Sequence, residues 1–393
     1  MKFDNQTYRI TERGKFGSIT LIIGIIGLVL SAIGWFTDAT QFYFSYLTSF
    51  VFWISIAWGG LFFVMLHHLV NAKWSIVIRR FGESLMLIIP FMLLFFIPIL
   101  FGMKDLFQWN NPEIVAGDHL LQGKAGYLNQ TFFIIRLVAY FIIWSGLAYL
   151  LNKFSMQQNK KSSFDQTKKW RIISAPGMIL FAVTLTLASF DWLMSLDAHW
   201  YSTIFGVYIF SGAFLAMLSL TVFIIIRLQS QGVLTNEITG EHFHDLGKLM
   251  FAFTIFWGYM AFSQYFLMWY GNIPEETVWF LHRWEGSWRT VTFLIVFGHF
   301  CLPFFVLFPQ TIKRNKTIMS IIAIWILLMR WVDLHWIIMP TLYHHGVHLS
   351  WIDGVTMIGM GGIFLFLFWR IFAAHPIIPV QDPHLKKSIE FIS

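Results

Sequence analysis

The sequence predicts an all-α, polytopic membrane protein, a helical bundle with about ten transmembrane helices. The first observation is composition: 57% of the residues are hydrophobic and 12% are charged, which leaves too little polar surface for a water-soluble globule. The second is the recurrence of apolar runs that reach the ~20 residues needed to cross a bilayer. The third is the concentration of Lys and Arg in alternate loops between these runs.

The expected spans are apolar runs bounded by Gly, Pro, Asn and charged residues. In chain order they are Gly17–Phe36, Tyr46–Val70, Ser84–Met103, Gln130–Leu151, Ser174–Met194, Thr203–Arg227, Leu246–Tyr270, Trp288–Pro309, Thr317–Met339 and Asp353–Phe372. We expect the first span to be retained, because the polar segment Met1–Lys15 leads into a run long enough to stay in the bilayer. The chain 1–393 is expected to form a single membrane domain.

Basic residues predict the orientation. They gather before the first span, after the second span, in the fourth and eighth loops and in the tail, at Lys2, Arg9, Arg13, Lys15, Lys73, Arg79, Arg80, Lys153, Lys160, Lys161, Lys168, Lys169, Arg171, Lys313, Arg314, Lys316, Lys386 and Lys387. Both termini are therefore predicted to be cytoplasmic, in a bacterial inner membrane. The net charge of +7 reflects this topology and not binding to nucleic acid.

The longest inner loop is predicted to be a linker. Residues 152–173 contain the polar run Gln157–Ser163, which is typical of a solvated segment. We expect this cytoplasmic linker to separate helical sub-bundles 17–151 and 174–373.

The densest polar cluster follows the fifth span near the outer surface. Asp191, Asp197 and His199 lie beside Trp200 and Tyr201. Quinol oxidation needs a slot for the ring, acceptors for two hydroxyl protons and an exit to water, and these residue types supply all three. The alternative is a tight loop with Asp caps and aromatic anchors.

Ionisable residues inside spans are costly, so each one is a functional hypothesis. Arg330 and Asp333 are three residues apart, share a helix face and are expected to pair, either as a structural ion pair or as part of a proton route. His299 is expected near the midplane, as a hydrogen-bonded core residue or a proton relay. Arg136, close to the outer surface, is expected to snorkel to the headgroups. On the inner side, His67, His68 and Glu83 extend this discontinuous proton route.

Histidines in the outer loops invite comparison with a metal site. His282 and Arg283 precede the eighth span, and His344, His345 and His348 follow the ninth, but the spacing shows no convergent ligand set and no metal is predicted. With Cys301 as the single cysteine, iron–sulfur clusters are not expected in this chain. A bis-histidine haem is not expected either, since His299 has no partner at its depth.

Three stretches resemble a known family. They are Ser189–Phe205 (SFDWLMSLDAHWYSTIF), His282–Trp288 (HRWEGSW) and the tail Pro379–Ser388 (PVQDPHLKKS). Together with ten spans, they resemble the polysulfide-reductase membrane-subunit superfamily as found in alternative complex III, most closely its F subunit.

This resemblance implies a place in a quinol:cytochrome c oxidoreductase. The implied partners are periplasmic iron–sulfur and multihaem cytochrome c subunits, a homologous second membrane subunit and a terminal oxidase. The implied substrate is a quinol such as menaquinol, with Asp191, Asp197 and His199 as the motif positions for quinol or proton chemistry and His282 and Arg283 as weaker candidates.

We therefore predict a subunit that contributes a quinol-like pocket near the periplasmic face, a proton-conducting path, or both. The sites assigned to chemistry are Asp191, Asp197, His199, Arg330, Asp333 and His299, and those assigned to quinol binding are Asp197, His199, Trp200, His282 and Arg283. Two other classes stay open. One is a structural anchor of the complex, and the other is a secondary transporter. Helix kinks at Pro90 and Pro98 in the third span and at Pro303 and Pro309 in the eighth span would be compatible with a transporter.

Overall fold

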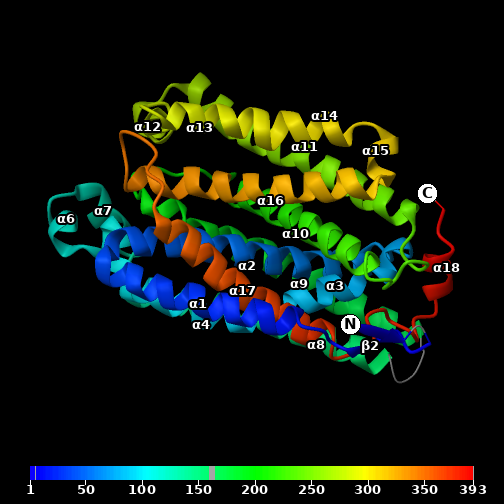
Figure 1. Ribbon diagram of the computed structural model, residues 1–393. Helices are drawn as coiled ribbons and strands as arrows, with labels where there is room; N and C mark the ends of the chain where they lie inside the picture. Colours follow the sequence, from blue (N-terminus) through cyan, green and yellow to red (C-terminus); the bar gives the residue numbers. More distant parts are fainter. Residues whose placement is uncertain (5, 159–163, 393) are drawn as a thin grey trace.

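The computed structural model describes residues 1–4, 6–158 and 164–392, and is an all-α bundle (Figure 1). Ten helices in this part of the chain are long and apolar enough to cross a membrane, which confirms the predicted fold class. They are α1 (Phe16–Thr37), α2 (Ala39–Leu69), α3 (Arg79–Met86) with α4 (Ile89–Phe101), α8 (Gln130–Gln158), α9 (Phe164–Trp192), α10 (Phe205–Gln229), α11 (Gly240–Gly271), α13 (Trp288–Leu294) with η4 (Ile295–Cys301) and α14 (Leu302–Leu307), α16 (Lys316–Ile338) and α17 (Trp351–Phe372).

Short elements connect these helices. They are the antiparallel strands β1 (Lys2–Asp4) and β2 (Arg9–Glu12), and the helices η1 (Trp74–Val77), α5 (Met103–Leu106), η2 (Gln108–Asn110), α6 (Pro112–Ala116), α7 (His119–Lys124), η3 (Met194–Leu196), α12 (Pro274–His282), α15 (Gln310–Arg314), η5 (Met339–Thr341) and α18 (Leu385–Ile389). Both termini lie at one end of the bundle, with α15 and α18, whereas α6, α7 and α12 lie at the opposite end (Figure 1). We call the end that holds both termini the inner end and the opposite one the outer end. The distribution of Lys and Arg predicts that the inner end faces the cytoplasm.

Helix α2 forms the centre of the bundle. Most of its side chains are buried, from Gln41 to His68, and it is in contact with α1, α9, α10, α16 and α17. A helix that is apolar on all sides is buried within a protein or a membrane. The partners of α2 come from both halves of the sequence, so the packing crosses the predicted boundary between sub-bundles.

Helices α1 and α17 approach each other closely through glycines. A Cβ atom placed on Gly27 would lie 2.4 Å from the Cα atom of Gly359, and one on Gly362 would lie 2.5 Å from the Cα atom of Gly24. Small residues at such a contact allow two membrane helices to approach closely, and van der Waals packing then stabilises the pair. The first and last spans are thereby joined, which the division into sequence halves did not anticipate.

The predicted inner linker is largely helical where the structure describes it. Helix α8 continues to Gln158, and α9 begins at Phe164. The 29 residues of α8 span about 44 Å, which exceeds the hydrocarbon thickness, so the helix continues beyond the apolar layer into polar surroundings. A hydropathy window marks only the apolar part of such a helix. The remainder of the predicted polar run, 159–163, lies outside the described residues.

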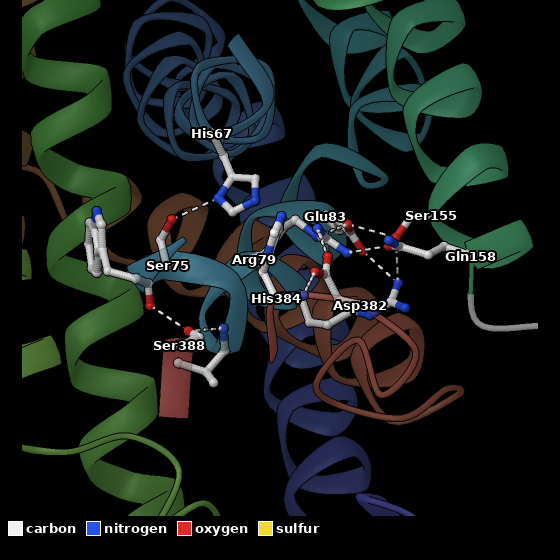
Figure 2. A network of polar contacts seen from close by, with 12 residues as sticks. His67, Ser75, Arg79, Glu83, Ser155, Gln158, Asp382, His384 and Ser388 are labelled. Atoms are coloured by element: carbon white, nitrogen blue, oxygen red, sulfur yellow. Dashed lines mark hydrogen bonds and ion pairs between the residues drawn. The ribbon is translucent and has the colours of Figure 1, made fainter. Parts of the chain in front are cut away.

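Buried charges at the inner end form a closed network (Figure 2). The Glu83 carboxylate accepts hydrogen bonds from Arg79 Nε (3.0 Å), Arg80 Nη1 (2.6 Å) and Ser155 Oγ (2.7 Å). Arg79 also pairs with Asp382 of the C-terminal tail, at 2.9 Å. Two guanidinium groups therefore face two carboxylates, and the network holds the tail against α3 and α8.

Candidate functional site

One cavity at the outer end brings together all five residues predicted to bind quinol. Its volume is about 360 Å³, and it lies between the connection that follows α9, helix α12 and η5. Its lining includes Asp197, His199, Trp200, His282 and Arg283. Segments that are far apart in the sequence thus meet here, and we call this space the outer cavity.

Arg283 lies at the buried side of the outer cavity and is 2% exposed. Its guanidinium donates to the carbonyl oxygens of Trp336 (3.1 Å), Ile337 (2.6 Å) and Trp279 (2.7 Å). The first two belong to the last turn of α16, whose carbonyls lack partners within the helix and carry the negative end of its dipole. Burial lowers the pKa of Arg283 to about 9, and the nearby Asp197 carboxylate opposes that shift.

Three histidines and two carboxylates line the outer cavity: His199, His282, His344, Asp197 and Glu275. His199 Nε2 lies 2.5 Å from the Asp118 carboxylate, which caps the start of α7. The rings of His282 and His344 are 5.3 Å apart, and burial, with a smaller effect from His344, lowers the pKa of His282. The outer cavity is therefore polar at its mouth. Among the described residues, no group of three or more His, Cys, Asp or Glu side chains has the arrangement to hold a metal ion.

Asp191, which was predicted to belong to the same polar cluster as Asp197 and His199, does not line the outer cavity. Both of its carboxylate oxygens accept from Arg136, at 2.8 and 2.9 Å, and the Tyr140 hydroxyl donates to one of them at 2.7 Å. The prediction that Arg136 snorkels was also wrong. Its guanidinium lies 3.8 Å from the centre of the Tyr127 ring. Arg136 and Asp191 are both buried, because each supplies the hydrogen bonds and the counter-charge that the other needs.

The one predicted ion pair, Arg330 and Asp333, lies deep in the bundle. Arg330 Nη1 is 2.6 Å from Asp333 Oδ2, as the shared helix face predicts, and both side chains are 0% exposed. The Tyr208 hydroxyl of α10 donates to the other oxygen of Asp333. The guanidinium occupies the space beside Gly212, where a Cβ atom would lie 2.4 Å from Arg330 Nη1.

His299 lies close to this pair, on the π-helical segment η4. Its ring is 4.1 Å from that of Trp257 and is fully buried. Neither ring nitrogen has a hydrogen-bond partner within the described chain. Such single-turn π segments occur frequently at functional sites, and a buried imidazole without partners calls for an explanation.

A larger cavity reaches these groups from the lipid-facing surface, and we call it the lipid cavity. Its volume is about 580 Å³, and it lies between α11, α12, α13, η4 and α16. Tyr259, Phe262 and Phe297 line it and are each more than half exposed on the apolar surface of the bundle. At its buried side it is lined by Tyr208, which is bonded to Asp333, and by Trp257, which covers His299.

A wall of three tryptophans separates the two cavities. Trp200 lines the outer cavity and stacks on Trp279 at 4.5 Å, and Trp279 meets Trp336 of the lipid cavity edge to face at 5.3 Å. The Arg283 guanidinium lies 3.3 Å from the centre of the Trp279 ring. The lipid cavity and the outer cavity are thus neighbours across one layer of aromatic rings and a buried cation.

Several of these residues were missed from the sequence. Tyr208 and Trp257 lie inside apolar helices, where aromatic residues are ordinary core or lipid-facing residues and give no local signal. Asp118 had a signal, because an Asp before an apolar helical turn is a typical N-cap, although that does not predict its contact with His199.

The fold defines a polytopic, all-α membrane protein with a cavity that opens on the apolar surface of the bundle. Comparison of the sequence with protein-family models and with curated proteins finds no match.

Proposed function

We propose that this chain is an integral membrane subunit of a quinol:electron-acceptor oxidoreductase, and that a quinol-like ring binds in the lipid cavity. The observation that supports this most directly is an aromatic cavity that opens on the apolar surface and ends at Tyr208 and Trp257. A quinol reaches its site through the bilayer, presents a flat ring and carries two hydroxyl groups. A lipid opening, aromatic walls and a few polar groups at the buried side match these properties.

The polar groups suit the proton part of the reaction. Oxidation of one quinol releases two protons and two electrons. Tyr208, bonded to Asp333, offers a hydrogen-bonded acceptor at the buried side of the lipid cavity, and Arg330 compensates the charge. Beyond the tryptophan wall, the outer cavity supplies Asp197, His199 and His282 as an outlet toward water.

Electrons are proposed to leave through partner subunits. With one cysteine in the sequence, a cluster ligated by cysteines of this chain alone is excluded. The family resemblance suggests periplasmic iron–sulfur and multihaem cytochrome c subunits as acceptors, beside a homologous membrane subunit and a terminal oxidase. Under this proposal the outer end, with its loops and α12, faces those partners.

The test is covalent labelling with a photoreactive azido-quinone, followed by peptide mapping of the purified chain in lipid nanodiscs. Label is expected on α11 and on the α13–η4 segment. Ala261 lines the lipid cavity, and Ala261→Phe should reduce labelling at least about tenfold by filling it. The control Ile321→Phe adds bulk at a site on α16 that is 63% exposed and outside the cavity, and should leave labelling unchanged. Equal labelling of both variants would refute the assignment of this cavity.

A secondary transporter is the second candidate, supported by interruptions in two spans. The third span breaks between α3 and α4, and the eighth changes to π-helical geometry in η4. If the ten spans are counted in two sets of five, these are the third spans of each set, and broken helices at matched positions are typical of transporters. Uptake of a solute by proteoliposomes that contain the chain alone would favour transport over quinol oxidation.

A further inference from the structure

A third cavity, at the inner end, is separate from both sites described above. Its volume is about 460 Å³, and it is bounded by the start of α1, the end of α10 and the end of α17. Its lining has two parts. Three cations, Arg13, Lys15 and Arg227, lie at one part, and apolar side chains that include Phe223, Ile224 and Leu365 form the other. We call this space the inner groove.

The cations of the inner groove have no carboxylate partner among the described residues. Arg13 makes a long contact to the Ala373 carbonyl oxygen, at 3.4 Å, and the Arg227 guanidinium lies 5.2 Å from the Phe223 ring centre. Lys15 is exposed and forms no ion pair with any residue that the structure describes. Three positive charges thus line one cavity, and no described residue supplies a counter-charge to them.

Three other arginines at the inner end have carboxylate partners. Arg79 pairs with Glu83 and Asp382 (Figure 2), Arg80 pairs with Glu83, and Arg314 pairs with Glu241 at 2.9 Å. These three arginines therefore have counter-charges within the bundle. The cations of the inner groove line one cavity and have no such counter-charge among the described residues.

The backbone holds the cations beside the apolar wall. Gly14, with φ of +63°, turns the chain between β2 and α1, so that its neighbours Arg13 and Lys15 both line the groove. Trp369 Nε1 donates to the Arg13 carbonyl oxygen at 3.2 Å, and the Phe16 ring meets the Trp369 ring at 5.4 Å. Tryptophan and basic residues at a helix end are typical of the headgroup level of a membrane.

We propose that the inner groove binds an anionic phospholipid from the membrane leaflet at the inner end of the bundle. The phosphate lies against Arg13, Lys15 and Arg227, and an acyl chain lies along Phe223, Ile224 and Leu365. Basic pockets between membrane helices bind anionic headgroups in this way, with cations at headgroup depth and apolar walls below. A soluble phosphate would use only the cations and leave the apolar wall without a role.

The test is native mass spectrometry of the purified full chain in detergent, titrated with phosphatidylglycerol and with phosphatidylcholine of the same acyl chains. The wild type should bind phosphatidylglycerol more tightly. Each removed cation is expected to weaken that binding roughly fivefold, so the triple variant Arg13→Gln, Lys15→Gln and Arg227→Gln should lose the preference. Ile224→Trp, which fills the apolar wall without changing charge, should weaken binding of both lipids.

The matched control removes three exposed inner-end charges outside the groove, by Lys73→Gln, Lys386→Gln and Lys387→Gln. It should keep the preference for phosphatidylglycerol. The proposal is overturned if the control and the groove variant lose binding equally, if wild type binds the two lipids equally, or if Ile224→Trp has no effect. It is also overturned if glycerol phosphate at matched concentration displaces the lipid, because the ligand would then be a soluble phosphate.

Discussion

Two buried Arg–Asp pairs have the same chemistry and different surroundings. Arg136 and Asp191 join α8 to α9 through two parallel hydrogen bonds, with Tyr140 as a third donor. Arg330 and Asp333 lie on one helix and share one such bond, and Arg330 Nε has no partner in the described chain.

The difference indicates different roles. A bidentate pair between helices satisfies both ions and fixes the geometry of the bundle. A single bond within one helix does not join helices by itself. The Arg330–Asp333 pair is connected to α10 by Tyr208, a lining residue of the lipid cavity, and by a longer contact of 3.4 Å from Arg330 Nη2 to the Ile209 carbonyl oxygen. We interpret the first pair as structural and the second as the polar centre of the candidate site.

The largest expected effect is on the first pair. Arg136→Leu or Asp191→Leu alone leaves a buried charge without its partner and should lower the free energy of unfolding by ~3–5 kcal/mol. The double variant Arg136→Leu/Asp191→Leu leaves no stranded charge and should recover most of this loss. Thermal unfolding of the purified proteins in one detergent measures both. A double variant no more stable than the singles would contradict a structural pair.

The next largest effect on stability is expected at Tyr208 and Tyr140, the tyrosines that donate to the two Asp carboxylates. Tyr208→Phe removes a donor to the less satisfied carboxylate and should cost ~1.5–3 kcal/mol, the usual range for a hydrogen bond to a charged group. Tyr140→Phe leaves Asp191 with both bonds from Arg136 and should cost less.

Function separates these variants further. In the assembled complex, Tyr208→Phe should reduce quinol oxidation by about 10²-fold or more if Tyr208 participates in proton transfer. Tyr140→Phe should leave it unchanged. Quinol-dependent reduction of the acceptor, measured at equal assembly, decides this, and equal rates for the two variants would remove the functional distinction between the pairs.

Two glycines provide a steric comparison. Gly212→Ala places a Cβ atom against the Arg330 guanidinium and should destabilise by ~1–3 kcal/mol, because the buried ion has to move. Gly146→Ala on α8 meets open space and should be neutral or stabilising by about 0.5–1 kcal/mol. Unfolding midpoints of the two variants measure the contrast. A Gly212→Ala variant with an unchanged unfolding midpoint would show that Arg330 is free to rearrange.

The smallest effect concerns pH at the outer cavity. Burial lowers the pKa of His282 below its usual 6.5, so the unfolded chain takes up this proton at a higher pH than the folded chain. Between the folded pKa and about 6.5, stability should therefore rise with pH and fall on acidification. His282→Gln should flatten this slope, whereas His345→Gln, at a side chain that is 96% exposed, should not. Unfolding midpoints from pH 5 to 7 provide the measurement.

The sequence by itself determined the fold class and the approximate spans. Apolar runs and the distribution of Lys and Arg are local signals, since a bilayer imposes a length on each helix. The pairing of Arg330 with Asp333 also followed from local spacing, because residues three apart share a helix face. Asp197, His199 and Trp200 were selected by residue type, and His282 and Arg283 through the family resemblance. Their convergence in one cavity does not follow from local spacing.

Only the tertiary structure decided which polar groups meet. Arg136 and Asp191 are far apart in the sequence, and their pairing depends on how α8 lies against α9. The lipid cavity is formed by side chains from several helices, so no single segment contains its signal. The approach of α1 to α17 likewise depends on glycines that are ordinary within each helix and matter only when they face one another. Periodicity reports what one helix exposes, and the identity of the neighbouring helix is settled by packing.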